Sequence, residues 1–398
     1  MNRSEPRHGA LHGIRVIDLS TSISGAWCGK MLSDFGASVA LIEGPEGHPA
    51  RQIAPFDKDS NSVVASYVLA NRRSAVVDMS EAEGIGIVQA AIERADVLVC
   101  NVTPEELTKM GLDLEPLLEK TDGLIVCCIT PHGYTGARSA QPGNNLTASA
   151  LSGWASINGL ADRPPLKASG FQASYCAGTM AYSSIVSALL HRQKHDPHWG
   201  QFIDISELEV MTSTFGPALL AGQYEGKPPG RVEKVDMSTG PVPVKDGHFA
   251  LTISRPHFWR DAMNVLGLGD LAEDPRWGTR WYRQQHAEEY VYRAQEKLSA
   301  WNKMDLFDAL AALRVIAGPV LETNELVENA HLRDREFFQL PENRRPDFPG
   351  PAFKMSQSPA EISRHAPEPG ADTAHVLSEF AGLREISIKS LMKSGAAR

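Results

Sequence analysis

The sequence predicts an α/β fold built around a parallel sheet, and three neighbouring segments carry that prediction. Residues 14–19, IRVIDL, form the short apolar, β-branched run that is typical of a buried strand. A helical stretch follows at 25–34 and closes at Gly36, and a second strand occupies 38–42, SVALI. A strand, a helix and a strand in such close succession form a βαβ unit, whose two strands must run parallel.

The same alternation continues along the first half of the chain. Apolar runs predict further strands, and amphipathic or well-capped stretches predict the helices between them. The expected strands are 74–79, 96–102, 124–129 and 201–205; the expected helices are 81–94, 103–110, 145–155, one ending near Leu190, and 206–223. The loop after 124–129, TPHGYTGARSAQPG, is broken by Gly and Pro, and ligands bind at such carboxyl ends of strands in open α/β sheets.

A second, smaller unit is expected in the later part of the chain. Residues 223–244 are rich in Gly, Pro and Lys and indicate a linker. A strand at 248–253 and helices starting at His257, Glu288 and Lys303 indicate an inserted α+β domain. We therefore expect three segments: a large α/β domain at 1–222, the linker and small domain at 223–314, and a return to the large domain with a Pro-rich tail at 315–398.

Composition narrows the possible partners. The net charge of -9 argues against nucleic acid and anionic membranes as main partners, and no apolar run is long enough to span a bilayer. The five cysteines are odd in number, lie mostly in apolar runs and include no CxxC. This pattern indicates reduced thiols in a cytoplasmic protein, with neither disulfides nor a metal site. His191, His195 and His198 have near-helical spacing but fit a solvated helix end better than a metal site.

A dinucleotide site is not indicated at the first strand. The G-x-G-x-x-G fingerprint is absent, and the loop at 20–24 holds Ser and Thr instead. Glu43 closes the second strand where a ribose-binding acid would stand, but a solvent-facing strand end explains it equally well.

The segment 169–183, SGFQASYCAGTMAYS, is the best candidate for covalent chemistry. It is uncharged and rich in small residues, and Gly170 and Gly178 allow a close approach of the backbone. Ser174 and Cys176 bring a hydroxyl and a thiol to nearly the same place. The segment contains no Asp or Glu. The nearest carboxylates downstream are Asp196 and Asp204, and Asp204 lies in the expected strand 201–205, where a structural role is indicated.

A series of local patterns runs in order through nearly the whole chain. It opens with LHGIRVIDLSTSISG at 11–25 and continues with Leu32–Ala37, Asn71–Ser74, Pro104–Gly111, Gly133–Gly136, Pro142–Gly143, Ser152–Gly153, Gly200–Gln201, Asp204–Ser206, Lys245–Gly247, Asp274–Arg276 and Gly318–Val320. Each pattern alone is weak, but the ordered set resembles the class III CoA-transferase family, of the formyl-CoA and carnitine CoA-transferase type.

This resemblance implies an architecture and a ligand. The fold would be a Rossmann-like large domain with a smaller domain inserted late, in an interlocked homodimer or a heterodimer with a homologous subunit. Coenzyme A, as an acyl-CoA substrate, would bind near the carboxyl ends of the first strands, and no metal would be needed. The matching contact positions are Ser22, Ile23, Val77, Met79, Asn101, Lys109 and Met110. Lys109 would suit a CoA phosphate as a mobile point charge, whereas Val77 and Met79 are equally compatible with a core role.

The resemblance also shows what this chain lacks. The transferases attack the thioester with an Asp four residues before a Gly, and with Gly178 as that glycine the position is Ser174. Only a carboxylate forms both the anhydride and the thioester intermediates. The racemase branch uses an Asp in a turn before a helix, and the matching residue here is Asn145. His132 stands near that turn but not at the expected histidine position. Both acid positions are therefore neutral.

Several functions fit this pattern. The first is a class III CoA-transferase-like protein acting on the CoA thioester of a carboxylic acid, either through a nonstandard nucleophile or as the Asp-less subunit of a heteromeric enzyme. Ser174 would form an ester that is a poor donor back to CoA, whereas Cys176 would form a thioester if its pKa were lowered. The alternatives are an acyl-CoA racemase or isomerase, which needs two positioned bases, and a non-catalytic CoA-binding subunit.

Overall fold

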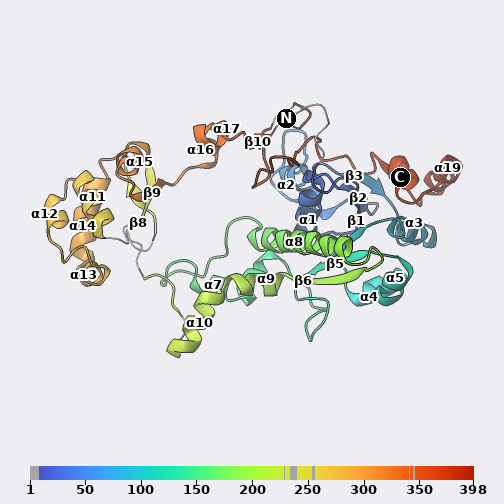
Figure 1. Cartoon of the computed structure of the whole chain (residues 1–398), viewed down its shortest axis with the longest axis horizontal. Coiled ribbons are helices and arrows are strands. Elements are labelled where there is room, and N and C mark those ends of the chain that lie inside the picture. The colour runs from blue at the N-terminus through green and yellow to red at the C-terminus, as the bar shows by residue number, and fades with distance from the viewer. Residues whose placement is uncertain (1–8, 228, 234–239, 253–255, 340, 344–345) are drawn as a thin grey trace. The chain divides into compact units, whose positions relative to one another are not determined.

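The computed structural model describes residues 9–227, 229–233, 240–252, 256–339, 341–343 and 346–398, and they form two compact units (Figure 1). Unit 1 takes the described residues of 1–155, 167–228 and 331–398, and unit 2 takes those of 156–166 and 229–330. Unit 1 is thus made of three stretches of the sequence, and the two stretches of unit 2 lie between them.

The framework of unit 1 is a six-stranded sheet in which every pair of neighbouring strands is parallel. The strands are β1 (Arg15–Asp18), β2 (Ser38–Glu43), β3 (Arg73–Val76), β4 (Val97–Cys100), β5 (Ile125–Thr130) and β6 (Gln201–Ser206), in the order β3-β2-β1-β4-β5-β6. The order reverses between β1 and β4, which places a topological switch point at their carboxyl ends. The predicted α/β fold with a Rossmann-like parallel sheet is confirmed.

Helices cover the two faces of this sheet (Figure 1). Neighbouring residues of a strand point to opposite faces, so Ile17 packs beneath α3 and α18 while Val16 packs beneath α1 and α8. The helical elements of unit 1 include α1 (Ile23–Asp34), η1 (Pro49–Gln52), α2 (Val63–Val68), α3 (Ala82–Ile92), α4 (Pro104–Lys109), α5 (Leu114–Lys120), α6 (Asn145–Leu151), α8 (Gln172–Lys194), α9 (Glu207–Thr214), α10 (Gly216–Glu225), α17 (Ala330–Asp334), η2 (Pro341–Asn343), α18 (Thr373–Glu379) and α19 (Glu385–Ser394), and α7 (Trp154–Ile157) crosses into unit 2.

The C-terminal segment of the chain contacts the residues that follow strand β3. Val77 forms a bridge with Ala397, and the Asp78 amide donates to the Ala396 carbonyl at 3.0 Å. Upstream, the Asn71 side chain accepts hydrogen bonds from the Ser363 and Arg364 amides at 2.8 and 3.0 Å. A short antiparallel pair, β10 (Phe338–Gln339) with β11 (Phe348–Pro349), precedes that contact. These contacts fasten the last part of the chain to the first.

Unit 2 has its own three-stranded antiparallel sheet and its own core. The strands are β7 (Val242–Val244), β8 (Gly247–Thr252) and β9 (Ile316–Pro319), and the helices are α11 (Pro256–Val265), α12 (Gly269–Glu273), α13 (Arg280–Gln285), α14 (Ala287–Leu298), α15 (Lys303–Ala312) and α16 (Thr323–Glu328). The core centres on Trp259, whose indole nitrogen donates to the Leu271 carbonyl at 3.0 Å. Because β9 pairs with β8, the compact unit extends past the expected return at 315; the domain boundaries drawn from the sequence stay a prediction.

Two local expectations were wrong. The helix expected to end near Leu190 runs from Gln172 to Lys194, so most of the segment 169–183 is helical. The helix expected at 206–223 is divided into α9 and α10 around Phe215, where Pro217 follows and cannot donate an amide hydrogen bond. In both cases the correction changes which side chains share a helix turn.

Candidate active site

The carboxyl ends of the central strands hold polar loops. Ser22 follows β1 and caps α1, since its hydroxyl accepts from the Gly25 amide at 3.1 Å and lies 2.9 Å from the Ser24 hydroxyl. Asn101 follows β4, and its side-chain oxygen accepts from the Thr21 amide at 2.7 Å. The predicted CoA contacts Ser22, Ile23 and Asn101 therefore occupy this edge of the sheet together.

The other predicted CoA contacts lie in different surroundings. The Val77 side chain is fully buried in the core, and Met79 packs against that core. Lys109 is the exposed last residue of α4, while Met110 closes the helix and packs inward. The assignment of these residues to CoA stays a prediction.

Helix α8 approaches α1 closely because Gly178 has no side chain. A Cβ atom at Gly178 would lie 2.4 Å from the carbonyl oxygen of Ser24 and 3.0 Å from the Cβ of Trp27. Residues four apart share one face of a helix, so Ser174, one turn earlier, also faces α1. Ser174 is buried, with 5% of its surface exposed.

Asn145 secures the first turn of α8. Its side-chain oxygen accepts from the Ala173 amide at 2.9 Å and from the Ser174 amide at 3.3 Å, and its amide nitrogen donates to the Gly170 carbonyl at 3.1 Å. Phe171, the residue that precedes the helix, provides no side-chain cap. Asn145 thus acts as a cap from outside the helix and satisfies amides that would otherwise lack a partner. Its amide group is held at both ends, which suits a structural role better than proton transfer.

Glu207 lies beside Ser174 and was missed by the sequence analysis. It is the first residue of α9, directly after β6, and only 5% of its surface is exposed. The side chains of Ser24 and Ser174 are close enough to its carboxyl group to lower the carboxyl pKa. The only signal available in the sequence was an acid directly after a Ser at a strand end, outside the segment in which an acid was sought.

Burial raises the pKa of the Glu207 carboxyl above its usual value. The Ser24 and Ser174 side chains and the nearby His132 imidazole oppose that rise. The first turn of a helix also favours a negative charge. Burial is the largest of these influences, so the pKa of the Glu207 carboxyl is raised overall.

His132 is in the loop after β5 that reaches the start of α9. Its neighbour Pro131 accepts a hydrogen bond from the Leu208 amide at 3.1 Å. The buried Nδ1 atom of His132 makes no hydrogen bond within the described parts of the chain. The structure brings His132 near Glu207 and not into a pair with Asn145.

Cys176 lies two residues after Ser174 in surroundings that do not activate a thiol. It is half-buried and packs against Ala148, Ala173 and Met211. Burial raises the pKa of the Cys176 thiol, so little thiolate is present at neutral pH. These surroundings support a packing role for this residue.

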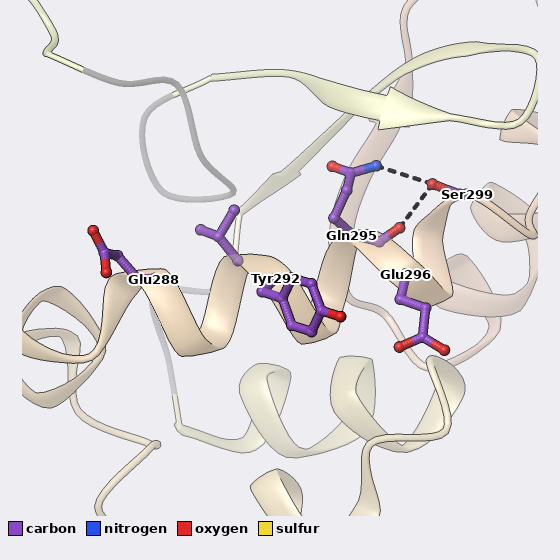
Figure 2. A pocket seen from close by; sticks show the side chains of 6 residues that line it. Glu288, Tyr292, Gln295, Glu296 and Ser299 are labelled. Carbon is purple, nitrogen blue, oxygen red and sulfur yellow. Dashed lines mark hydrogen bonds between the residues drawn. The ribbon is translucent and has the colours of Figure 1, made fainter.

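Other features of the described residues involve none of the predicted site residues. A pocket of about 630 Å³ in unit 2 is lined by α14 residues, among them Tyr292, Gln295 and Ser299, and by none of the predicted site residues (Figure 2). Within the described ranges, no His, Cys, Asp or Glu group of three or more could hold a metal ion. No helix in those ranges is both long and apolar enough to cross a bilayer.

The model of CoA-transferase family III matches residues 11–373. The chain belongs to CoA-transferase family III.

Individual relatives agree with that assignment. A succinate–glutarate CoA-transferase of Agrobacterium fabrum is 32% identical over 95% of this chain and 96% of its own length. The succinyl-CoA:(R)-benzylsuccinate CoA-transferase subunit BbsE of Thauera aromatica is 28% identical over 96% of this chain and 97% of its own. Among solved structures, a CAIB/BAIF family protein from Brucella suis superposes with a TM-score of 0.85 at 25% identity, over 94% of this chain and all of that one.

Proposed function

We propose that this chain transfers CoA from a dicarboxylic acyl-CoA, such as succinyl-CoA, to a second carboxylic acid. Family membership establishes a CoA-transferase-like protein acting on carboxylic acid CoA thioesters. The dicarboxylic donor comes from the relatives, whose names specify succinate or succinyl-CoA. The observation that carries the proposal is the family match over residues 11–373, together with the similarity to a succinate–glutarate CoA-transferase over 95% of this chain.

The CoA would lie along the carboxyl edge of the sheet. Ser22, Ile23 and Asn101 offer backbone and polar side-chain groups there, and the exposed Lys109 offers a mobile positive charge for a phosphate. Val77 and Met79 would contribute backbone groups, since the Val77 side chain is buried. Replacing Lys109 by Met tests this part: the Michaelis constant for the acyl-CoA should rise, with little change in turnover.

The test of the main proposal is exchange by the purified chain. The protein is incubated with succinyl-CoA and, one at a time, with glutarate, mesaconate and benzylsuccinate, and the CoA esters are separated by chromatography. Formation of the acceptor's CoA ester, without net hydrolysis, is the expected result. Hydrolysis alone, or no new ester with any acceptor, would contradict the proposal.

The second candidate is the Asp-less subunit of a heteromeric CoA-transferase. Two observations favour it: the neutral residues Ser174 and Asn145 at the family's acid positions, and the similarity to a protein named as a subunit, BbsE. In this case exchange would appear only when a homologous subunit that carries the Asp is added. Whether the chain forms a homodimer or a heterodimer, interlocked or not, is measured by mass photometry of the protein alone and with such a subunit.

Racemase or isomerase activity has less support. Proton transfer next to the thioester needs two positioned acid or base groups, and the side chain of Asn145 is neutral and hydrogen-bonded to Gly170 and to the start of α8. Deuterium uptake at the α-carbon of an acyl-CoA in heavy water would indicate this activity, and its absence is expected.

A further inference from the structure

We propose that Glu207 is the nucleophilic carboxylate of this enzyme and replaces the aspartate that the family has at the position of Ser174. The inference rests on the proposed CoA-transferase function and names the residue that performs it. It also explains how a chain without the usual Asp retains the fold and the surroundings of the site.

The position of Glu207 is fixed by three elements that meet at the carboxyl edge of the sheet. Helix α9 begins directly after β6, and the Ser206 hydroxyl caps it by accepting from the Glu209 amide at 3.2 Å. Ser24 comes from the first turn of α1 and Ser174 from the first turn of α8, and both side chains interact with the Glu207 carboxyl group and lower its pKa. The carboxyl group therefore stands at the Ser174 side chain, where the family nucleophile would be, but is delivered from the neighbouring helix.

The exchange of residue types is chemically consistent. Two carboxylates in contact repel each other, so an Asp at position 174 beside Glu207 would raise the pKa of one of them. A serine at that position is neutral, and its side chain favours the ionised form of the Glu207 carboxyl group. Glutamate is one methylene longer than aspartate, which suits a group that reaches toward α8 from α9.

Other carboxyl groups near this edge are already engaged or point to solvent. Asp18 pairs with Arg72 at 2.6 Å, and Glu43 accepts from Arg51 at 2.8 Å. Asp204 is exposed and accepts from the Tyr134 amide at 2.8 Å. Among these acids, Glu207 alone combines burial with contacts to hydroxyls and without an Arg or Lys partner among the contacts described.

The reaction balances with the substrates alone. A Glu207 oxygen attacks the thioester carbonyl carbon, the C–S bond breaks, and CoA leaves as the thiolate while a mixed anhydride forms. The thiolate then attacks the glutamyl carbonyl carbon, and the donor acid leaves as its carboxylate. The acceptor carboxylate attacks the resulting glutamyl thioester and again releases the thiolate, which attacks the acceptor's acyl carbon and returns Glu207 as a carboxylate. No oxidant, reductant or metal ion takes part.

The proposal is tested with three variants of the full chain and one control. Glu207→Gln keeps the shape but cannot attack, so CoA exchange should fall by roughly three orders of magnitude or more. Glu207→Asp should keep part of the activity, because the shorter carboxylate is still an acid. Ser174→Asp combined with Glu207→Gln returns the carboxylate to the family position and should regain exchange relative to Glu207→Gln. Glu209→Gln changes an exposed acid of the same helix turn and should turn over like wild type.

Each outcome decides a separate point. Wild-type exchange by Glu207→Gln would overturn the Glu207 assignment and leave the transferase function standing. If the Glu207→Asp and double variants fold, by thermal unfolding, yet are as inactive as Glu207→Gln, the role of Glu207 is structural and the assignment fails. If the wild-type chain exchanges nothing with any acceptor, the proposed function itself fails, and the nucleophile assignment fails with it.

Discussion

Two buried acidic groups lie against helix α1, one toward its middle and one at its start, and their partners differ in kind. Toward its middle, α1 lies against Asp18 and Arg72, whose carboxylate and guanidinium are 2.6 Å apart and fully buried. At its start, Ser24 of α1 contacts Glu207, which has hydroxyl partners instead of a cation. The first arrangement neutralises a buried charge, whereas the second leaves a carboxyl group free to change its state.

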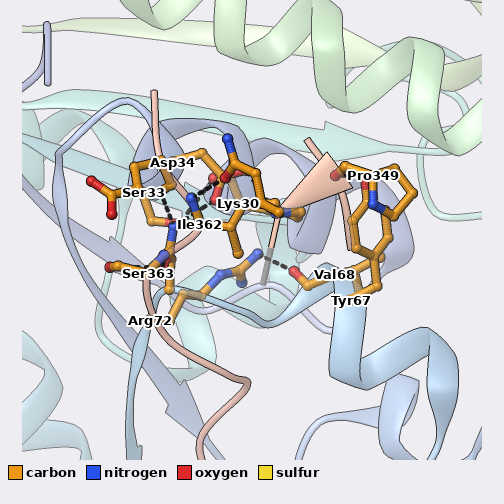
Figure 3. Close-up of polar contacts among 12 residues, drawn as sticks. Lys30, Ser33, Asp34, Tyr67, Val68, Arg72, Pro349, Ile362 and Ser363 are labelled. Atoms are coloured by element: carbon orange, nitrogen blue, oxygen red, sulfur yellow. Dashed lines mark hydrogen bonds and ion pairs between the residues drawn. The ribbon is translucent and has the colours of Figure 1, made fainter. Parts of the chain in front are cut away.

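The Asp18 cluster shows what a structural buried charge looks like. Arg72 also donates to the carbonyls of Val68, at 2.8 Å, and Ala26, and Lys30 pairs with Asp34 at 2.6 Å one turn further along α1 (Figure 3). Burial raises the pKa of the Asp18 carboxyl, and the Arg72 guanidinium opposes that rise. With nearly every polar atom paired, this cluster holds β1, α1 and β3 together and has no group available for a substrate.

The largest effect is expected from breaking this structural pair. Arg72→Met removes the guanidinium and leaves Asp18 buried without a cation, which should lower the free energy of unfolding by about 3–5 kcal/mol. Urea denaturation followed by circular dichroism measures it. Adding Asp18→Asn to Arg72→Met should recover part of the loss. A loss below about 1 kcal/mol for Arg72→Met would contradict the structural role assigned to this pair.

The next effect concerns the approach of α8 to α1. Gly178→Ala places a methyl group 2.4 Å from the Ser24 carbonyl oxygen, so the two helices must separate. We expect a loss of about 1–3 kcal/mol in unfolding free energy and a fall in exchange, because Ser24 and Ser174 move apart around Glu207.

Gly86→Ala is the matched control for this prediction. Gly86 lies in α3, and a Cβ atom there would meet nothing within 4 Å. Alanine favours helix by up to about 1 kcal/mol over glycine, so this variant should be as stable as wild type or slightly more stable. Equal effects of the two substitutions on stability would show that the close contact between α1 and α8 is absent in solution.

A smaller effect follows from the raised pKa of Glu207. A carboxyl group with a raised folded-state pKa contributes stability that is fully present below its unfolded pKa and is lost as pH rises through the folded value. The groups facing Glu207 are the Ser24 and Ser174 hydroxyls and the His132 imidazole. Glu207→Gln should therefore gain stability relative to wild type as the pH rises from acidic to neutral. Thermal unfolding across that range measures the difference, and parallel curves for both proteins would contradict the shift.

The smallest effect is expected at the thiol. Cys176→Ala removes a half-buried sulfur whose raised pKa leaves it protonated at neutral pH, so CoA exchange should match wild type. Steady-state exchange rates check this directly. A loss of exchange as large as that expected for Glu207→Gln would instead indicate that Cys176 is the nucleophile.

Local sequence patterns predicted most of the large unit. Short apolar runs gave the strands around Ile17, Val99 and Cys127, because strands buried on both faces need continuous hydrophobicity. The start of α8 was not predictable in the same way. The side chain that caps this helix is Asn145, which lies far earlier in the chain. No sequence pattern near Gln172 therefore indicates where the helix begins.

The candidate site stays a prediction, and the sequence analysis did not include Glu207 in it. Ser174 was singled out from its neighbours and from the family resemblance, and the structure places it at the carboxyl edge near α1. Glu207 was missed because a side chain that reaches across from another helix has no fixed sequence distance to the position it serves. Such a contact is set by the packing of α8 and α9 after β6, which only the three-dimensional structure provides.

The most direct test of the central claim uses the wild-type chain. The protein is mixed with succinyl-CoA, treated with hydroxylamine to convert an acylated carboxyl group into a stable hydroxamate, and digested for peptide mass spectrometry. The account predicts a hydroxamate on Glu207 that requires the acyl-CoA and is absent from Glu209. A modification on any other residue, or none while exchange proceeds, would contradict it.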